Sequence, residues 1–233
     1  MPEKKLRTLY LSICPWIVIF LLLYSGCHIQ REHASRVTPF PLKTGNLTVF
    51  GVRPAMSEGD QPGVIRSPIS GAVFMANPVP QGVAERITEN LFTRLLECKK
   101  YELIGPNQAK GVFSSLIASN QGMSDVELFQ RIGQTFSADA VIVGYVYRWR
   151  EREGTQYAIK RPASVAFDLY LLRPDDGAVL WKGRFDKTQR SLSENILDIG
   201  TFLKGKGRWM TAEELAELGL ADLLDRSLLC GKE

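Results

Sequence analysis

The run ADAVIVGYVYRWR, residues 138–150, is the strongest structural signal in this chain. Its first part, 138–144, is apolar on both faces of an extended chain, as in a strand buried at the centre of a sheet. From Tyr145 onward, aromatic residues recur at every second position, with arginines between the last of them. We therefore expect a long central strand that begins beneath helices and ends as a projecting ribbon.

Two more strands are expected after this central run. In residues 165–171 every second residue is apolar, and the sequence PDDG at 174–177 is typical of a tight turn. A second alternating segment follows, with Val179, Trp181 and Phe185 on one face. With the central strand, these segments predict a three-stranded antiparallel meander in the second half of the chain.

The first half combines short strands with helices. Strands are expected at 47–52 and 101–104, and an amphipathic helix of about eighteen residues is expected from Gln81, because apolar residues recur there at every fourth position. Residues 54–80 contain several prolines and glycines. We expect a long irregular connection there, and such connections are often functional.

Three further helices complete the predicted fold. One carries an apolar stripe from Ala109 to Ile117, and two begin with capping-box patterns, Ser124 with Glu127 and Thr211 with Glu214. The fold class is α/β, in the sense of α+β: one domain with a mixed sheet and a C-terminal antiparallel meander packed by helices.

The N-terminus resembles a bacterial lipoprotein signal peptide. Nineteen uncharged residues, 8–26, follow a basic start, and Ser25 and Gly26 stand directly before Cys27. Tyr24 departs from the pattern, in which leucine is usual at that place. The resemblance implies cleavage before Cys27 and acylation of its thiol, which places the protein on the periplasmic face of the outer membrane. The alternative is an uncleaved single-pass anchor in the inner membrane, since this apolar segment is long enough to span about 30 Å of hydrocarbon.

The chain therefore divides into three parts: a lipoprotein signal peptide at 1–26, a tether at 27–44 and a single α/β periplasmic domain at 45–230. Removal of residues 1–26, which carry three basic and one acidic residue, lowers the formal net charge from +4 to +2. This balance indicates no strong electrostatic partner. The domain contains two cysteines, Cys98 and Cys230. We disfavour a bridge between them because Cys98 lies in a predicted helix and Cys230 lies near the chain end.

The composition of the domain argues against common catalytic chemistries. Both histidines, His28 and His33, lie in the tether. Catalysis by Ser-His-Asp or Cys-His groups, and zinc binding through histidine, are therefore not expected in the domain. No glycine-rich phosphate-binding motif is present in the sequence. We expect no catalytic residues, no metal site and no cofactor.

Candidate contact residues follow from the end of the central strand. Tyr145, Tyr147 and Trp149 are expected on one face, with arginines on the other. Nucleic acid is not expected as a partner, because glutamates interrupt the run of arginines and the domain is expected outside the cytoplasm. A packed face opposite a solvated one is favoured over a protein-contact surface. The candidates for protein contact, including the end of a basic loop at 203–210, are Tyr147, Arg148, Trp149, Arg150, Arg152 and Trp209.

Several segments together resemble periplasmic lipoproteins of the curli-assembly family. More loosely, the chain is similar to lipoprotein activators of penicillin-binding proteins and to the N-terminal domain of the Tol-Pal translocation protein. The matching segments are the first strand, the helix at 83–96, the strand at 138–144, the strand at 165–171 with its Asp-Gly turn, and residues 187–193. The similarity covers roughly residues 45–228 and rests on their order and spacing.

The resemblance implies a non-catalytic accessory or scaffold protein that is held at the membrane by its N-terminal lipid and binds an envelope protein or itself. The alternative is an oligomeric subunit of a curli-type outer-membrane secretion channel. Such channels insert hairpins whose strands alternate over about nine to eleven residues. Residues 150–162 and 191–210 do not show this alternation, so the tethered scaffold is favoured.

Overall fold

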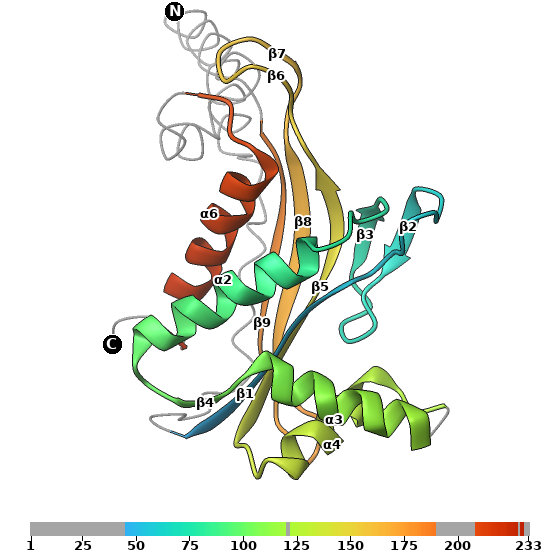
Figure 1. Cartoon of the computed structure of the whole chain (residues 1–233), viewed down its shortest axis with the longest axis vertical. Helices are drawn as coiled ribbons and strands as arrows, with labels where there is room; N and C mark the ends of the chain where they lie inside the picture. The colour runs from blue at the N-terminus through green and yellow to red at the C-terminus, as the bar shows by residue number, and fades with distance from the viewer. Residues whose placement is uncertain (1–44, 120–121, 190–207, 228, 231–233) are drawn as a thin grey trace, which may run out of the picture. The chain divides into compact units, whose positions relative to one another are not determined.

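A five-stranded mixed sheet forms the centre of the computed structural model, which describes residues 45–119, 122–189, 208–227 and 229–230 (Figure 1). In the sheet β4 and β5 run parallel to β1, whereas β8 and β9 continue from β5 as antiparallel neighbours. The predicted α+β class and the meander are confirmed. In spatial order the strands are β4 (Glu102–Ile104), β1 (Asn46–Pro54), β5 (Ala140–Arg150), β8 (Ser164–Leu172) and β9 (Val179–Thr188).

Both faces of the sheet are covered, which explains why β5 and β8 are apolar along nearly their whole length. Helices α2 (Val83–Cys98) and α6 (Ala212–Asp225) pack on one face and form the larger core. Helices α3 (Pro106–Ser119) and α4 (Asp125–Thr135) cover the lower part of the other face (Figure 1).

The helix starts are where the sequence places them. Ser124 and Glu127 form a capping box at α4, and Thr211 and Glu214 form one at α6. In each, the hydroxyl and the carboxylate bind backbone N–H groups that have no partner within the helix. Leu220 and Leu224 of α6 are buried against the sheet, and Leu228, four residues further along, lies outside the described residues.

Cys98 and Cys230 form a disulfide, so our preference against this bridge is wrong. Their Cα atoms lie 5.4 Å apart across 132 residues of sequence. The reason is tertiary: Arg86 at the start of α2 pairs with Glu213 at the start of α6. The two helices thus run in parallel, which brings the residues that follow α6 to the C-terminal end of α2.

The expectation that three aromatic residues of β5 share one face is wrong for Trp149. Val146 pairs with Phe167 of β8, but Arg148 already pairs with the next residue, Ala166. The extra residue is a β-bulge, which shifts the alternation of faces by one position. Tyr145 and Tyr147 therefore face the core beneath α3 and α4, whereas Trp149 lies in the core beneath α2 and α6.

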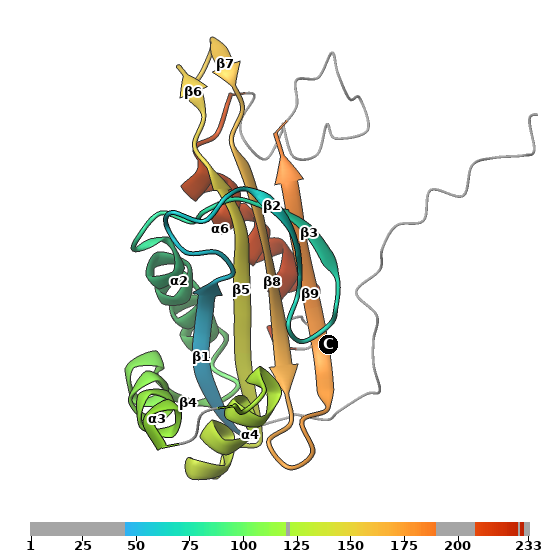
Figure 2. The same cartoon turned by 90° about the vertical axis from the view of Figure 1, so that its right-hand side faces the viewer.

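Beyond the bulge, the chain forms the expected ribbon. Strands β6 (Glu153–Gly154) and β7 (Ile159–Arg161) pair as an antiparallel hairpin at the end of the sheet (Figure 2). The connection at 54–80 is less irregular than expected, because it contains a second hairpin formed by β2 (Gly63–Arg66) and β3 (Val73–Ala76). None of the helices in the described ranges has the length and apolar character needed to cross a membrane. Residues 8–26, which are expected to belong to a cleaved signal peptide or, in the alternative, to form a membrane anchor, lie outside them.

Candidate functional site

The β2–β3 hairpin lies against the sheet face that α3 and α4 leave uncovered (Figures 1 and 2). Its inner side is anchored by Phe74, which is buried and stacks on Tyr147 of β5 with ring centroids 3.8 Å apart and planes 4° apart. A two-stranded hairpin is marginally stable in isolation. Packing on Tyr147 therefore explains how so short a hairpin persists.

Two arginines hold β3 through its backbone. Arg148 of β5 donates to the carbonyl oxygen of Met75 at 3.0 Å, and Arg184 of β9 donates to that of Val73 at 3.1 Å. The Arg184 guanidinium also lies 4.1 Å from the centroid of the Phe74 ring, in a cation–π contact. Both arginines pair with Asp186 of β9, so one carboxylate orients the two groups that hold the hairpin.

A buried carboxyl group lies beneath the connection between β2 and β3. Asp168 of β8 is only 2% exposed, and its Oδ2 accepts hydrogen bonds from the hydroxyls of Tyr147 at 2.9 Å and Tyr170 at 2.6 Å. The Tyr170 hydroxyl is also hydrogen-bonded to Ser67 at 2.8 Å and Ser70 at 2.6 Å, both in the connection between β2 and β3. The network thus ties the hairpin to the sheet.

Burial raises the pKa of Asp168 to about 6, although the hydrogen bonds from the two phenols oppose this shift. Burial and the nearby carboxylate also raise the pKa of Tyr147 and that of Tyr170, so both phenols remain protonated donors. The network holds a carboxylate without a basic residue among its hydrogen-bond partners. This is an arrangement for positioning the hairpin, with no nucleophile and base in contact.

The outer side of the hairpin is apolar and exposed. Val64 is 64% exposed, Val73 45% and Met75 62%. Val64 lies directly opposite Met75 in the strand register, and Val73 lies two residues before Met75. Since alternate residues of a strand share a face, the three side chains form one stripe across both strands. We call this stripe the outer hairpin face.

The six predicted contact residues do not form one surface. Tyr147 and Arg148 are buried beneath the hairpin, so the expectation of a solvated arginine face is wrong for Arg148. Arg152 donates to the carbonyl oxygen of Trp209, so these two candidates come together near the β6–β7 ribbon. Trp149 is buried on the opposite face of the sheet, and its ring centroid lies 6.0 Å from the Arg86 guanidinium. Arg150 is half-buried, and its Nε–H donates to no partner among the described residues. Cys27 lies outside them.

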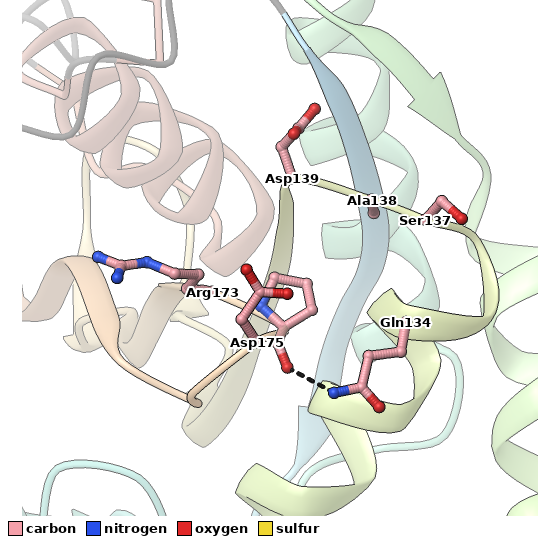
Figure 3. Close-up of a pocket in the computed structure, with 7 residues that line it drawn as sticks. Gln134, Ser137, Ala138, Asp139, Arg173 and Asp175 are labelled. Carbon is pink, nitrogen blue, oxygen red and sulfur yellow. Dashed lines mark hydrogen bonds between the residues drawn. The ribbon is translucent and has the colours of Figure 1, made fainter.

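A shallow polar pocket at the other end of the sheet offers no comparable arrangement. Its lining residues include Asp139, Arg173 and Asp175 (Figure 3). The Asp139 carboxylate accepts a hydrogen bond from the backbone of Asn46, and Gln134 donates to the carbonyl oxygen of Pro174 at 3.0 Å. Arg173 and Asp139 point in different directions (Figure 3). These groups close the turn and fix the start of β1. Within the described ranges, acidic residues, cysteines and histidines do not gather into a metal-binding group.

Part of this site could have been found from sequence. Asp168 is the one charged residue in SVAFDLYLL, the sequence of β8, and a lone carboxylate in an apolar strand indicates a buried polar network. Ser67 and Ser70 carry no such signal, because their connection shows no periodicity. Their role depends on the hairpin folding back onto Tyr170.

No protein-family model and no curated protein matches this chain. Similar solved structures include the PelC dodecamer from Paraburkholderia phytofirmans, with 12% identity over 82% of this chain and 91% of that one, at a TM-score of 0.43. Lipoprotein GNA1162 from Neisseria meningitidis is 15% identical over 69% of this chain and 92% of that one, at 0.40. The LpoB C-terminal domain from Salmonella enterica is 15% identical over 62% and 83%, at 0.36.

One of these neighbours is named as a lipoprotein. Their identities and TM-scores are low. What these proteins bind or assemble into is therefore not carried over to this chain.

Proposed function

We propose that this chain is a lipid-anchored, non-catalytic accessory protein of the periplasm, which binds another envelope protein through the outer hairpin face. The lipid on Cys27 fixes the protein at the membrane. The domain from 45 to 230 presents the hairpin to its partner.

The observation that carries this proposal is the contrast between the two sides of the hairpin. Its inner side is anchored by a buried aromatic stack, two arginines and a hydroxyl network. Its outer side exposes Val64, Val73 and Met75. Single exposed apolar side chains are common, whereas a contiguous stripe on a firmly held element is typical of a contact surface. Trp209, Arg150 and Arg152 lie in another region and remain candidates for a second contact.

The channel alternative finds less support. The connection between β5 and β8 contains only the two-residue β6 and the three-residue β7, whereas a membrane-spanning strand needs about nine to eleven residues. Most of the other segment at issue, 191–210, lies outside the described residues.

Photocrosslinking in cells that express the full chain tests the proposal. A photoreactive amino acid is placed at Val73, at Met75 or at Ile117, one position at a time. Ile117 of α3 is the matched control, because it is 45% exposed like Val73 but lies on a different element. We expect the same envelope protein, identified by mass spectrometry, to crosslink from Val73 and Met75 and not from Ile117.

Charge substitutions provide the second measurement. Val73→Glu and Met75→Glu should each abolish the crosslink from the other position, whereas Ile117→Glu should leave it intact. Equal adducts from all three positions, or none from the hairpin, would refute the proposed surface.

A further inference from the structure

The two strands of the hairpin differ in what their outer edges meet. In β3, the carbonyl oxygens of Val73 and Met75 point away from β2, where arginines bind them. In an antiparallel pair the residues directly opposite share this direction. Val64 and Arg66, which pair with Met75 and Val73, therefore also turn their backbone N–H and C=O groups away from the hairpin. No described residue bonds to these groups.

The open edge of β2 borders the outer hairpin face. Val64 and Arg66 have their side chains on this face, and both are exposed. Arg66 forms no ion pair within the described part of the chain. A strand beside β2 would thus meet an apolar side chain and, two residues along, an unpaired guanidinium.

The sequence limits how far such pairing extends. Pro62 precedes β2 and Pro68 follows it closely, and proline cannot donate to a ladder. The outward donors of this edge are therefore the amides of Val64 and Arg66. An edge of this length suits one short segment and disfavours open-ended sheet growth.

We propose that an extended segment of the partner protein adds to the outer edge of β2 as a third strand. On the face it shares with Val64 and Arg66, this segment carries an apolar residue and, two residues along, an aspartate or glutamate. Backbone hydrogen bonds supply affinity in such strand addition, and alternate side chains supply specificity. This inference rests on the proposed function, because it specifies how the hairpin binds its partner.

A fluorescent heptapeptide tests the mechanism. It alternates threonine with valine, aspartate and valine, so that the latter three share one face, and its anisotropy is titrated with the full-length protein in detergent micelles. We expect saturable binding that weakens about tenfold when lysine replaces the aspartate, as for loss of one charge-assisted contact.

The decisive comparison is between Arg66→Ala and Arg66→Pro. Both remove the guanidinium, but proline also removes the outward N–H and places its ring in the path of an added strand. The N–H groups that bond β2 to β3 belong to other residues, as Ser67 donating to Ala72 shows. We expect Arg66→Pro to bind about tenfold more weakly than Arg66→Ala, the effect of one lost backbone hydrogen bond.

Equal affinities for the two variants would overturn strand addition and leave the outer hairpin face as a side-chain contact. Absence of binding to the wild-type protein would overturn it as well. The photocrosslinking experiment judges the proposed function independently of both results.

Two further measurements use the wild-type protein and so do not depend on whether the variants fold. N-methylation of the peptide at alternate amides leaves the protein unchanged. Only alternate amides of an added strand face β2. Strand addition therefore requires that the peptide methylated on one series of alternate amides loses binding and that the peptide methylated on the other series keeps it. In the free protein, the amides of Val64 and Arg66 should exchange rapidly with solvent. Slow exchange there would mean that the chain itself or a second copy occupies the edge, and would overturn the proposal.

Discussion

Asp168 shows how one residue links the sheet to the hairpin. Its carboxyl group is buried beside aromatic and aliphatic side chains and the hydroxyls of Tyr147 and Tyr170, and its Oδ1 has no hydrogen-bond partner among the described residues. Such burial costs free energy when the group is charged, and the phenols of Tyr147 and Tyr170 offset part of that cost. Asp168 thus lowers the stability of the fold when it is charged, but it fixes the hydroxyl network that attaches the hairpin to the sheet.

The first prediction concerns the pH dependence caused by Asp168. Because its pKa is raised from 3.8 to about 6, the folded chain holds a proton more tightly than the unfolded chain between these values. Its contribution to stability therefore falls as the pH rises from about 4 to about 6, by about 3 kcal/mol in total. Asp168→Asn should lack this dependence. Denaturant unfolding at pH 4 and pH 7 measures the difference between wild type and variant at each pH.

The control for this prediction is Tyr147→Phe. This substitution removes one hydrogen bond that lowers the pKa of Asp168. In Tyr147→Phe the fall in stability should therefore continue to higher pH than in the wild type. If the difference between wild type and Asp168→Asn is the same at both pH values, the carboxyl group is not the titrating group.

The second prediction concerns Trp181 of β9. It is 7% exposed and lies in the core between the sheet and helices α2 and α6. Trp181→Ala should lower the free energy of unfolding by about 3–5 kcal/mol, because a large cavity is left in that core. Tyr157, which is 78% exposed, provides the control, and Tyr157→Ala should change stability by less than about 0.5 kcal/mol. A loss below about 1 kcal/mol at Trp181 would place its side chain outside the core.

At the scale of elements, local patterns were reliable where one segment carries its own signal. The period of four in α2, the capping boxes of α4 and α6, and the alternation in β9 each appear in the structure at the expected places. In these elements, short-range geometry and burial of one face agree.

Features that depend on tertiary proximity were missed. The bulge at Tyr147 is visible only through its pairing with β8, and the sequence alternates through it without interruption. The β2–β3 hairpin has short strands, and its stabilising contacts come from β5, β8 and β9. No pattern within 54–80 contains that information, so the connection looked irregular.

The third prediction concerns the disulfide between α2 and the residues after α6. A bond that closes a loop across 132 residues restricts the unfolded chain, and its removal should cost about 2–5 kcal/mol. Cys98→Ser, Cys230→Ser and the double variant should lose the same amount, because each breaks the same bond. Chemical unfolding with and without reductant measures this loss. Losses that add up in the double variant, or free thiols in the oxidised domain, would contradict the assignment.

At the scale of the whole molecule, the described residues form one mixed α+β domain, and the proposed anchor precedes it. Within the described ranges, the first residue of the hydrophobic cores is Leu47. A lipid on Cys27 and a contact surface on the β2–β3 hairpin would then be separate devices, joined by the tether at 27–44. A change in one should leave the other intact.

The last prediction tests this separation. A chain that begins at Thr44 should unfold in one cooperative transition, because it retains both cores and the disulfide.

The full chain with Cys27→Ser should lose the N-terminal acyl chains and leave the membrane fraction when the apolar segment is cleaved. Mass spectrometry of the purified N-terminus identifies the processing. An intact Met1 together with unchanged membrane fractionation of Cys27→Ser would favour the single-pass anchor, because an apolar helix of about twenty residues holds a protein in the bilayer without any lipid.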